Sequence, residues 1–360
     1  MNFDLPEEHS EVAELTTRIL EDHVNIENLR EIEAASDWFD RALWEKFVSS
    51  GIIGVTLNED VGGSGLDILA LVCILRSQGQ YVAPIPLLPN LVSAMTVDKF
   101  GSKEHRESLL PEVINVSKLL TFASQEFLND QFMEPHTEFK DGVITGKKLV
   151  VEYANHSDSA LVTVTTDEGP AVCIVDLKDP SIAMSSSDST RGEPLWEISF
   201  TETPAEKLAG IESVLWLFQV SLVGLCATQL GVTETALKMT ASYTSEREQF
   251  GRPLATFQAV TQRLADQFIN VGGIRLTTFS AAWRLSADLD ALEDTLIAKW
   301  WASERATEIA HASQHCHGGM GVSKDYPLHR YTLWNKHITT SLGAGTQTLR
   351  SLGVLLASEQ

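Results

Sequence analysis

Residues 7–115 carry a helical pattern of hydrophobic and polar positions. The stretches HSEVAELTTRILEDH, FDRALWEKFVSS, DILALVCILRSQGQ and LLPNLVSAMTVDKFG each place apolar residues at i, i+3 and i+4. The pattern predicts an N-terminal all-helical domain over residues 1–117. Gly62, Gly63 and Gly65 follow no strand and lack the Lys-Ser/Thr of a phosphate-binding loop, so they predict a loop that caps the next helix.

From Leu119 to about Thr203 the pattern changes to short runs rich in β-branched residues. These runs are GVITGKKLVVEY, SALVTVTT, PAVCIVDL and LWEISFTET, and clusters of Asp, Gly, Pro and Ser separate them. They predict a compact antiparallel β-domain, either a sandwich or a barrel, over residues 118–205.

Residues 206–360 return to a helical pattern. Helices are expected over roughly 209–246, 256–287, 290–315 and 346–358, and the third has an apolar stripe with charges opposite. The pattern predicts a C-terminal four-helix bundle. The chain is therefore expected to belong to the α+β class, with its domains in the order α, β, α.

Composition and charge exclude several classes of function. The 27 Lys and Arg residues against 49 Asp and Glu give a net charge of −22, which repels nucleic acid and anionic lipid. No secretory signal is visible, and no apolar run approaches the ~18 residues that a bilayer crossing needs. The four cysteines form no CxxC pair, which favours a reducing compartment. We expect a cytoplasmic protein with no nucleic-acid or membrane partner.

Two motifs in the C-terminal region resemble those of a known family. YTSEREQFGRPLATFQAVTQRLAD, residues 243–266, closely resembles the stretch Y-x-x-x-R-x-Q-F-G-x-P-L-x-x-F-Q-x-V-x-x-x-L-A-D of flavin-dependent acyl-CoA dehydrogenases. HCHGGMGVSKDYPLHRY, residues 315–331, is similar to that family's Q-x-x-G-G-x-G-x-x-x-[DE]-Y-P signature. With the α, β, α order, the resemblance covers nearly the whole chain.

Both motifs suit a site for a flavin dinucleotide. Arg247 is a permanent cation whose planar fork fits a pyrophosphate, and the paired glycines would let a backbone approach the ligand without a Cβ. The alternative is a plain helix-to-helix turn, with Arg247 solvated or paired to Glu246 or Glu248. The predicted FAD-binding residues are Arg247, Gln249, Phe250, Leu254, Phe257, Gln258, His315, Gly318 and Gly319.

The resemblance implies that these contacts act across a subunit interface. In this family, the arginine motif and the GGxG segment reach the FAD that the neighbouring subunit mainly holds. His315 stands where the family has glutamine, with Gln314 adjacent; an imidazole can also form hydrogen bonds.

The chain departs from the family where a subunit holds its own flavin. The family has T-E-P-x-x-G-S-D followed by a G-x-K-x-W-I-T strand, whereas residues 122–135 here contain no Gly-Ser-Asp. In GKKLVVEY, residues 146–153, Val150 and Glu152 replace the family's Trp and Thr. We expect the chain's own flavin site to be lost.

The family's catalytic base is also missing. Most members carry a glutamate in Y-E-G-T that removes the α-proton, but the stretch LGAGT here places Ala344 at that position. Some relatives with GAGT carry the glutamate on an earlier helix, one residue before a substrate-binding arginine. Those two positions fall on Ser221 and Leu222. No catalytic residue is therefore assigned to this chain.

This combination resembles the base-lacking β subunits of bacterial α2β2 heterotetrameric acyl-CoA dehydrogenases that oxidise steroid side chains, as in cholesterol catabolism. It implies a subunit that is inactive alone and shares one FAD with a homologous catalytic partner. That partner would supply the glutamate and hold most of the acyl-CoA, and an electron-transferring flavoprotein would accept the electrons.

Two other interpretations stay open. The first is a non-enzymatic scaffold or regulatory subunit without flavin contact; retention of the REQFGRP segment argues against it. The second is a metal site built from His311, His315 and His317 around Cys316. The HExxH glutamate is absent, and Cys316 would point away from the histidines on a helix. We therefore predict no metal.

Overall fold

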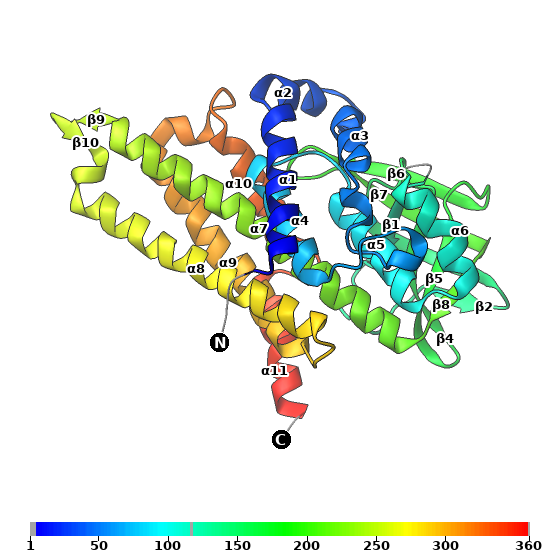
Figure 1. Ribbon diagram of the computed structural model, residues 1–360. Coiled ribbons are helices and arrows are strands. Elements are labelled where there is room, and N and C mark those ends of the chain that lie inside the picture. The colour runs from blue at the N-terminus through cyan, green and yellow to red at the C-terminus, as the bar shows by residue number, and fades with distance from the viewer. Residues whose placement is uncertain (1–4, 116–117, 359–360) are drawn as a thin grey trace. The chain divides into compact units, whose positions relative to one another are not determined.

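The computed structural model describes residues 5–115 and 118–358 of the chain (Figure 1). The chain divides into two compact units. Unit 1 comprises Met1–Leu29, Val72–Ala83 and Leu222–Gln360, and unit 2 comprises Arg30–Leu71 and Pro84–Ser221. Each unit therefore joins segments that lie far apart in the sequence.

The N-terminal helices form where the hydrophobic pattern predicts them. Asp40 begins α3 by accepting a hydrogen bond from the Leu43 N–H at 2.9 Å, and Ser102 and His105 form a capping box at the start of α6. The elements are α1 (Glu7–His23), α2 (Ile26–Ala34), α3 (Arg41–Ser49), η1 (Ile52–Gly54), η2 (Glu59–Val61), α4 (Ile68–Tyr81), α5 (Leu87–Phe100) and α6 (Lys103–Ile114).

The glycine-rich segment after η2 is a packed turn before α4. Gly63 donates its N–H to the Asn58 carbonyl at 3.0 Å, and Gly65 donates to the Leu57 carbonyl at 2.8 Å. A Cβ at Gly63 would lie 2.0 Å from the Leu57 oxygen, so only glycine fits there. Because these N–H groups are used within the turn, they are not available to cradle a phosphate.

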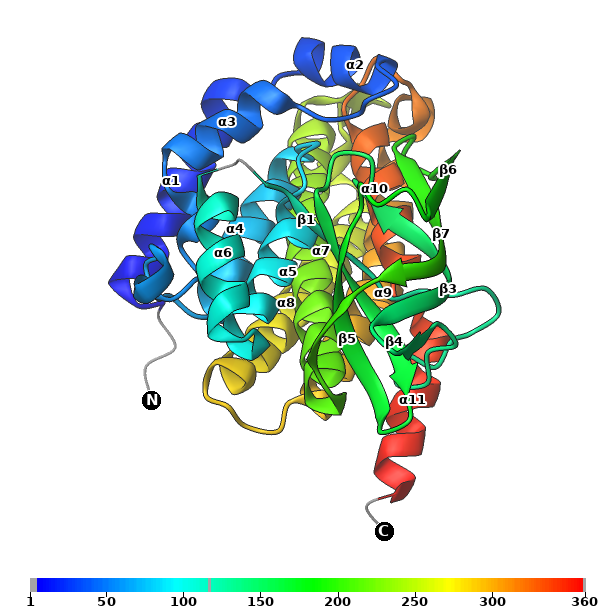
Figure 2. The same ribbon diagram turned by 90° about the vertical axis from the view of Figure 1, so that its right-hand side faces the viewer.

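Eight strands of unit 2 form one sheet with the order β6-β7-β3-β2-β4-β5-β8, and β1 pairs with β4 (Figure 2). Its core is apolar and includes Ile144, Val162 and Phe200. The strands are β1 (Leu120–Ala123), β2 (Glu138–Lys140), β3 (Val143–Glu152), β4 (Ser159–Thr166), β5 (Gly169–Asp176), β6 (Ile182–Asp188), β7 (Pro194–Pro204) and β8 (Glu206–Ala209).

The prediction of a purely antiparallel β-domain is wrong for two strand pairs. β1 runs parallel to β4, with Leu120 opposite Ser159, and β2 also pairs with β4 in parallel, with Glu138 opposite Thr165. Parallel neighbours need a long connection, and residues 124–158, which contain β2 and β3, supply it for β1 and β4. The other pairings of the sheet are antiparallel.

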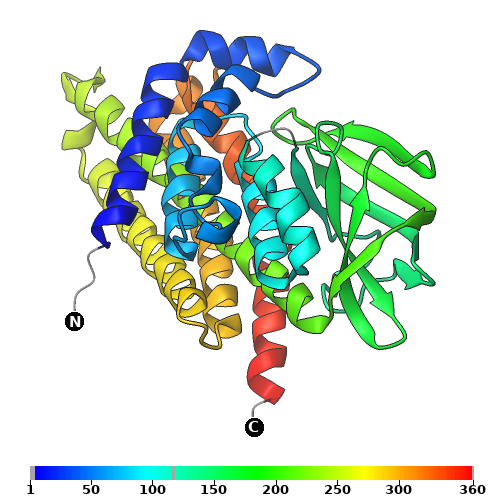
Figure 3. The same cartoon turned by 45° about the vertical axis from the view of Figure 1, so that its right-hand side comes forward.

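The C-terminal region is helical, and its four predicted helices are confirmed. A fifth helix, α10, was not predicted. α8 and α9 run side by side, as the yellow and orange helices of Figure 3 show. The elements are α7 (Ile211–Glu246), β9 (Glu248–Gln249), β10 (Arg252–Pro253), η3 (Leu254–Thr256), α8 (Gln258–Ser286), α9 (Leu292–His317), η4 (Gly318–Val322), α10 (Leu328–Thr340) and α11 (Gly345–Ser358).

α7 is the one helix of the described chain that is long and apolar enough to cross a bilayer. Of its most apolar 18-residue window, 72% is buried inside the protein. Such burial is typical of a core helix in a globular protein. The four cysteines are also buried, and all are free.

Candidate functional site

The first motif forms a short hairpin between α7 and α8, at the left-hand end of these helices in Figure 1. Gln249 pairs with Arg252 across a two-residue loop, Phe250-Gly251. Both loop residues have positive φ, 55° and 78°, which is the conformation of the tightest hairpin turns. The Phe250 side chain is 92% exposed, so the hairpin presents an aromatic ring to solvent.

Arg247 lies at the base of this hairpin. Its N–H donates to the Tyr243 carbonyl at 2.8 Å, and its carbonyl accepts from the Leu254 N–H at 2.8 Å. The side chain is exposed and forms no ion pair with another described residue. The predicted alternative, an ion pair between Arg247 and Glu246 or Glu248, is therefore not formed.

The apolar residues of the motif gather beside a second cation. The Phe250 and Phe257 rings meet edge to face, with centroids 6.1 Å apart. The Arg252 guanidinium carbon lies 4.1 Å from the Phe257 ring centroid, which is cation–π geometry. Leu254 is half-buried at the start of η3, and Gln258 is exposed at the start of α8. Arg252 lies inside the motif but was not among the predicted FAD-binding residues.

The second motif turns at the end of α9. Gly318 has a φ of 58°, and a Cβ added at Gly318 or Gly319 would meet no atom within 4 Å. The space around the Cα atoms of the two glycines is therefore open, and a ligand could approach the backbone there. At Gly321, by contrast, a Cβ would lie 2.9 Å from the Gln314 oxygen. His315 is exposed in the last turn of α9, next to this opening.

An aromatic cluster within unit 1 joins the two motifs. Tyr243, one turn before Arg247, stacks on His317, with ring centroids 4.3 Å apart and an interplanar angle of 23°. Tyr326 closes the cluster against both rings. His317 directly precedes Gly318. The structure thus brings the arginine hairpin and the glycine turn together through Tyr243, His317 and Tyr326. The sequence pointed to His317 only as a candidate metal ligand and predicted no contact among these three residues.

Comparison with known proteins identifies the family. Residues 6–117 match the family described as acyl-CoA dehydrogenase, N-terminal domain, and residues 209–352 match acyl-CoA dehydrogenase, C-terminal domain. The chain belongs to the acyl-CoA dehydrogenase family. Members of this family are oxidoreductases that bind FAD. The predicted domain limits, residues 1–117, 118–205 and 206–360, stay predictions.

This acyl-CoA dehydrogenase chain is similar to relatives of closely matching length. It is 34% identical to acyl-CoA dehydrogenase FadE27 of Mycobacterium tuberculosis, over 99% of both chains. A variant of the Tcur3481–Tcur3483 steroid acyl-CoA dehydrogenase matches with 38% identity and a TM-score of 0.94, over 98% of both chains. The ChsE4–ChsE5 complex from Mycobacterium tuberculosis matches with 34% identity and a TM-score of 0.94, over 99% of both.

Both positions predicted for the base of an acyl-CoA dehydrogenase lack an acid. Ser221 is fully buried in α7, and its hydroxyl donates to the Leu217 carbonyl at 2.6 Å. Leu222 is also buried, so neither side chain is presented to solvent. Ala344 is exposed, and its carbonyl accepts from the Thr348 N–H at 2.9 Å at the start of α11.

The β3 strand carries an ion pair where the resemblance places a flavin-facing threonine. The Glu152 carboxylate lies 3.7 Å from the Arg191 guanidinium, which also pairs with Glu193. The Arg191 guanidinium carbon lies 5.3 Å from the Trp38 ring centroid. Val150 occupies an irregularity of the strand with a φ of 57°. Where the resemblance places an aromatic wall, the chain therefore has a small side chain beside a guanidinium–carboxylate cluster.

The histidines near the end of α9 do not face a common point. His317 donates from Nδ1 to the Ser313 carbonyl at 2.8 Å, and its Nε2 lies 3.2 Å from the Tyr326 hydroxyl. His311 and His315 are exposed, whereas Cys316 is buried. Among the described residues, these four side chains form no cluster with metal-binding geometry.

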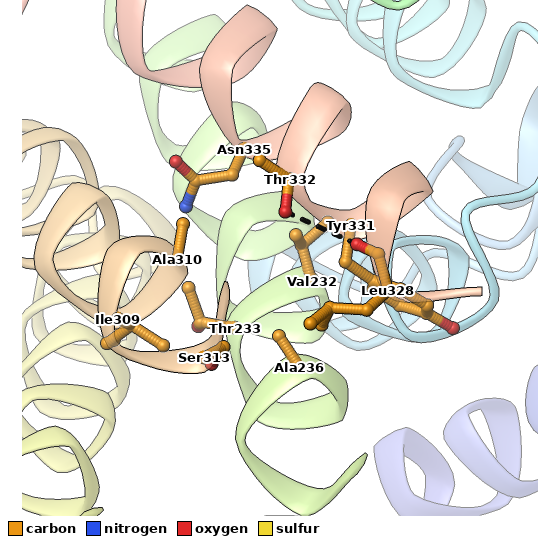
Figure 4. Close-up of a pocket in the computed structure, with 10 residues that line it drawn as sticks. All are labelled: Val232, Thr233, Ala236, Ile309, Ala310, Ser313, Leu328, Tyr331, Thr332 and Asn335. Atoms are coloured by element: carbon orange, nitrogen blue, oxygen red, sulfur yellow. Dashed lines mark hydrogen bonds between the residues drawn. The ribbon is translucent and has the colours of Figure 1, made fainter. Parts of the chain in front are cut away.

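A gap between α7, α9 and α10 is the pocket drawn in Figure 4. It has no room for a water molecule. Tyr331 and Asn335 lie on its α10 side, and the Thr332 hydroxyl bonds the Leu328 carbonyl at 3.3 Å (Figure 4). This gap between packed helices is too narrow to admit an acyl group.

Proposed function

We propose that this chain is a subunit of a heteromeric FAD-dependent acyl-CoA dehydrogenase. The complex would desaturate an acyl-CoA thioester between Cα and Cβ. In this proposal the chain donates FAD contacts across a subunit interface, and a homologous partner supplies the catalytic glutamate. The observation that carries the proposal is the exposed, unpaired Arg247 joined to the open glycine turn at Gly318, in a chain without an acid at either base position.

The chain's residues suit recognition of a dinucleotide. Arg247 and Arg252 are cations beside apolar rings, and a guanidinium binds phosphate oxygens in bidentate fashion. Gln249 and Gln258 are exposed amides, and Gly318 and Gly319 leave room for the ligand. A bound FAD would supply the hydride-accepting chemistry that desaturation at Cβ needs. The α-proton needs a base within hydrogen-bond reach, which in this proposal belongs to the partner.

We propose that the partner subunit binds this chain along α8. Ala265, Phe268, Gly272, Leu276, Phe279 and Trp283 recur at helical spacing and form one stripe. Phe268 is 73%, Leu276 74% and Trp283 54% exposed. At a rise of ~1.5 Å per residue the stripe is about 27 Å long, which matches a long helix of another subunit. Exposed apolar stripes of this size mark interaction surfaces.

Gly272 supports a helix as the occupant of this stripe. A glycine inside a helix costs about 0.5–1 kcal/mol relative to alanine, and within the chain nothing lies within 4 Å of a Cβ added there. The packing of this chain alone therefore does not require a glycine at position 272. A second helix whose backbone approaches closely would require one. Two similar structures, Tcur3481–Tcur3483 and ChsE4–ChsE5, carry names that pair two different chains.

The relatives support a proposal for the substrate, the electron acceptor and the location. Because a similar structure is named a steroid acyl-CoA dehydrogenase, we propose a steroid side-chain CoA ester as substrate, in an α2β2 heterotetramer. An electron-transferring flavoprotein is the proposed acceptor, and the cytoplasm is the proposed location.

Flavin content tests the proposal. The chain should be colourless when purified alone, and its complex with a homologous, glutamate-bearing subunit should absorb at about 450 nm and be bleached by substrate. Arg247→Ala should then weaken FAD binding about 10- to 150-fold, since a charge-assisted contact contributes about 1.5–3 kcal/mol. A flavin-free complex, or unchanged FAD affinity in the variant, would favour a scaffold.

A further inference from the structure

We propose that His317 is a positioning residue that fixes the arginine hairpin and the glycine turn in one arrangement for binding FAD. The inference rests on the proposed function and adds a residue to it. His317 itself faces the protein interior and is 3% exposed. Its influence on the ligand would pass through the two neighbouring segments.

The histidine ring is held in one orientation by two hydrogen bonds. A carbonyl oxygen can only accept, so the 2.8 Å contact between Nδ1 and the Ser313 carbonyl places the proton on Nδ1. In the neutral ring, Nε2 then accepts from the Tyr326 hydroxyl at 3.2 Å. Burial lowers the pKa of His317, which favours this neutral form.

On its flat face, the same ring contacts the helix that carries the hairpin. Tyr243 stacks on His317 at 4.3 Å, and Tyr326 lies 5.1 Å from His317 and 6.1 Å from Tyr243, measured between ring centroids. The last turn of α7 joins Tyr243 to Arg247 through the 2.8 Å bond from the Arg247 N–H. A shift of the His317 ring would therefore move the base of the hairpin.

On the other side, His317 is covalently joined to the glycine turn. Gly318 begins η4 with a φ of 58°, and this positive φ sets the direction of the chain immediately after the imidazole. Loss of the ring would remove the stack and the Tyr326 bond together. The two segments would remain folded, but their relative placement would be less restricted, and a preorganised site loses affinity when its parts must be ordered on binding.

The test measures FAD affinity of the assembled complex by fluorescence titration after flavin removal. His317→Ala should weaken FAD binding about fivefold to fiftyfold, because the stack on Tyr243 and both hydrogen bonds of the ring are lost. His317→Phe keeps the stack and should restore most of the affinity. His311→Ala, which removes an exposed histidine of the same helix, is the matched control and should bind FAD normally.

A double-mutant cycle separates positioning from general stabilisation. If His317 acts through the hairpin, His317→Ala should have much less effect on FAD affinity in an Arg247→Ala background than in the native one. Additive effects, or a lower melting temperature of the apo complex with unchanged FAD affinity, would overturn the proposal. If Arg247→Ala alone leaves FAD binding unchanged, the proposed function has failed, a result distinct from either outcome for His317.

Discussion

Glu126 shows how one residue organises the loop that follows β1. Its carboxylate accepts from the Lys148 ammonium at 2.6 Å, the Thr137 hydroxyl at 2.8 Å and the Thr137 N–H at 2.9 Å. Burial raises the pKa of Glu126, but the Lys148 charge and these bonds outweigh it and lower the pKa to about 2. Lys148 is fully buried and also donates to Thr163 at 3.0 Å. The loop that lacks the family's Gly-Ser-Asp is thus fixed to the sheet.

Removing the Glu126 charge should destabilise the chain strongly. Glu126→Gln leaves the Lys148 ammonium buried without its carboxylate, which typically costs about 3–5 kcal/mol. The matched control is Glu197→Gln, because Glu197 pairs at 2.7 Å with the adjacent but half-exposed Lys147. Exposed pairs contribute about 0–1 kcal/mol. Urea unfolding measures both variants, and equal shifts would contradict the assigned importance of the buried pair.

The same pair predicts a pH dependence of stability. The pKa of Glu126 falls from 4.5 to about 2 on folding, so the unfolded state binds more protons between these values. Stability from this carboxylate is complete above about pH 4.5 and is lost as the pH falls toward 2. The difference in urea midpoint between the native chain and Glu126→Gln should therefore shrink on acidification. A difference that is constant from pH 6 to pH 3 would show that Glu126 titrates normally.

At the scale of elements, local patterning predicted the helices better than the sheet. α8 and α9 were predicted because their apolar positions repeat at helical spacing. α10 was missed because it buries polar side chains, among them Arg330, Asn335 and His337, so its sequence shows no clean apolar stripe. The parallel pairing of β4 with β1 and β2 depends on contacts between segments far apart in the chain, which local periodicity does not report.

The sequence predicted which residues belong to the candidate site but not how their side chains contact one another. Arg247 and Gly318 were found from the motifs, yet nothing in their spacing shows that Tyr243 and His317 stack. Tyr243 is the first residue of the first motif, but an aromatic side chain at the end of a helix is ordinarily interpreted as part of the core. The tyrosine of the second motif, Tyr326, was visible in the sequence, but its hydroxyl's contact with His317 appears only when α7 and α9 are packed together.

Substitutions at Gly272 in the α8 stripe should affect the stability of the isolated chain and its binding to the partner in opposite directions. Gly272→Ala should stabilise the isolated chain by about 0.4–1 kcal/mol, because a Cβ meets nothing and the helix gains propensity. Gly272→Leu should weaken binding to the partner subunit, since its side chain would hold the partner's helix away. Asp266→Leu, an exposed change on α8 outside the stripe, is the control. Calorimetric titration that finds equal affinity for both leucine variants would exclude this stripe as the interface.

At the scale of the whole molecule, the losses in the chain reinforce one another. The acid is absent at both base positions, and the β3 strand has an ion pair in place of the expected flavin-facing residues. The residues proposed to act in trans are kept, and most of them are exposed, with Leu254 and Phe257 half-buried. A subunit that shares one FAD site with a partner would need the retained motif residues but not a base or a flavin site of its own. A net charge of −22 opposes association of two identical chains and favours a partner of different charge.

The last prediction concerns restoration of the base. Ala344→Glu introduces a carboxylate at an exposed position and should leave the chain folded, whereas a glutamate at the fully buried Ser221 would be a buried charge. A placed general base typically contributes 10²–10⁴-fold, but only beside a flavin and a bound thioester. We expect no rescue in a complex whose partner glutamate is changed to glutamine, measured as single-turnover flavin bleaching with a panel of acyl-CoA esters. Thr346→Glu, two residues away and also exposed, controls for the added charge. Bleaching restored by Ala344→Glu but not by Thr346→Glu would show that this chain keeps a working flavin site of its own.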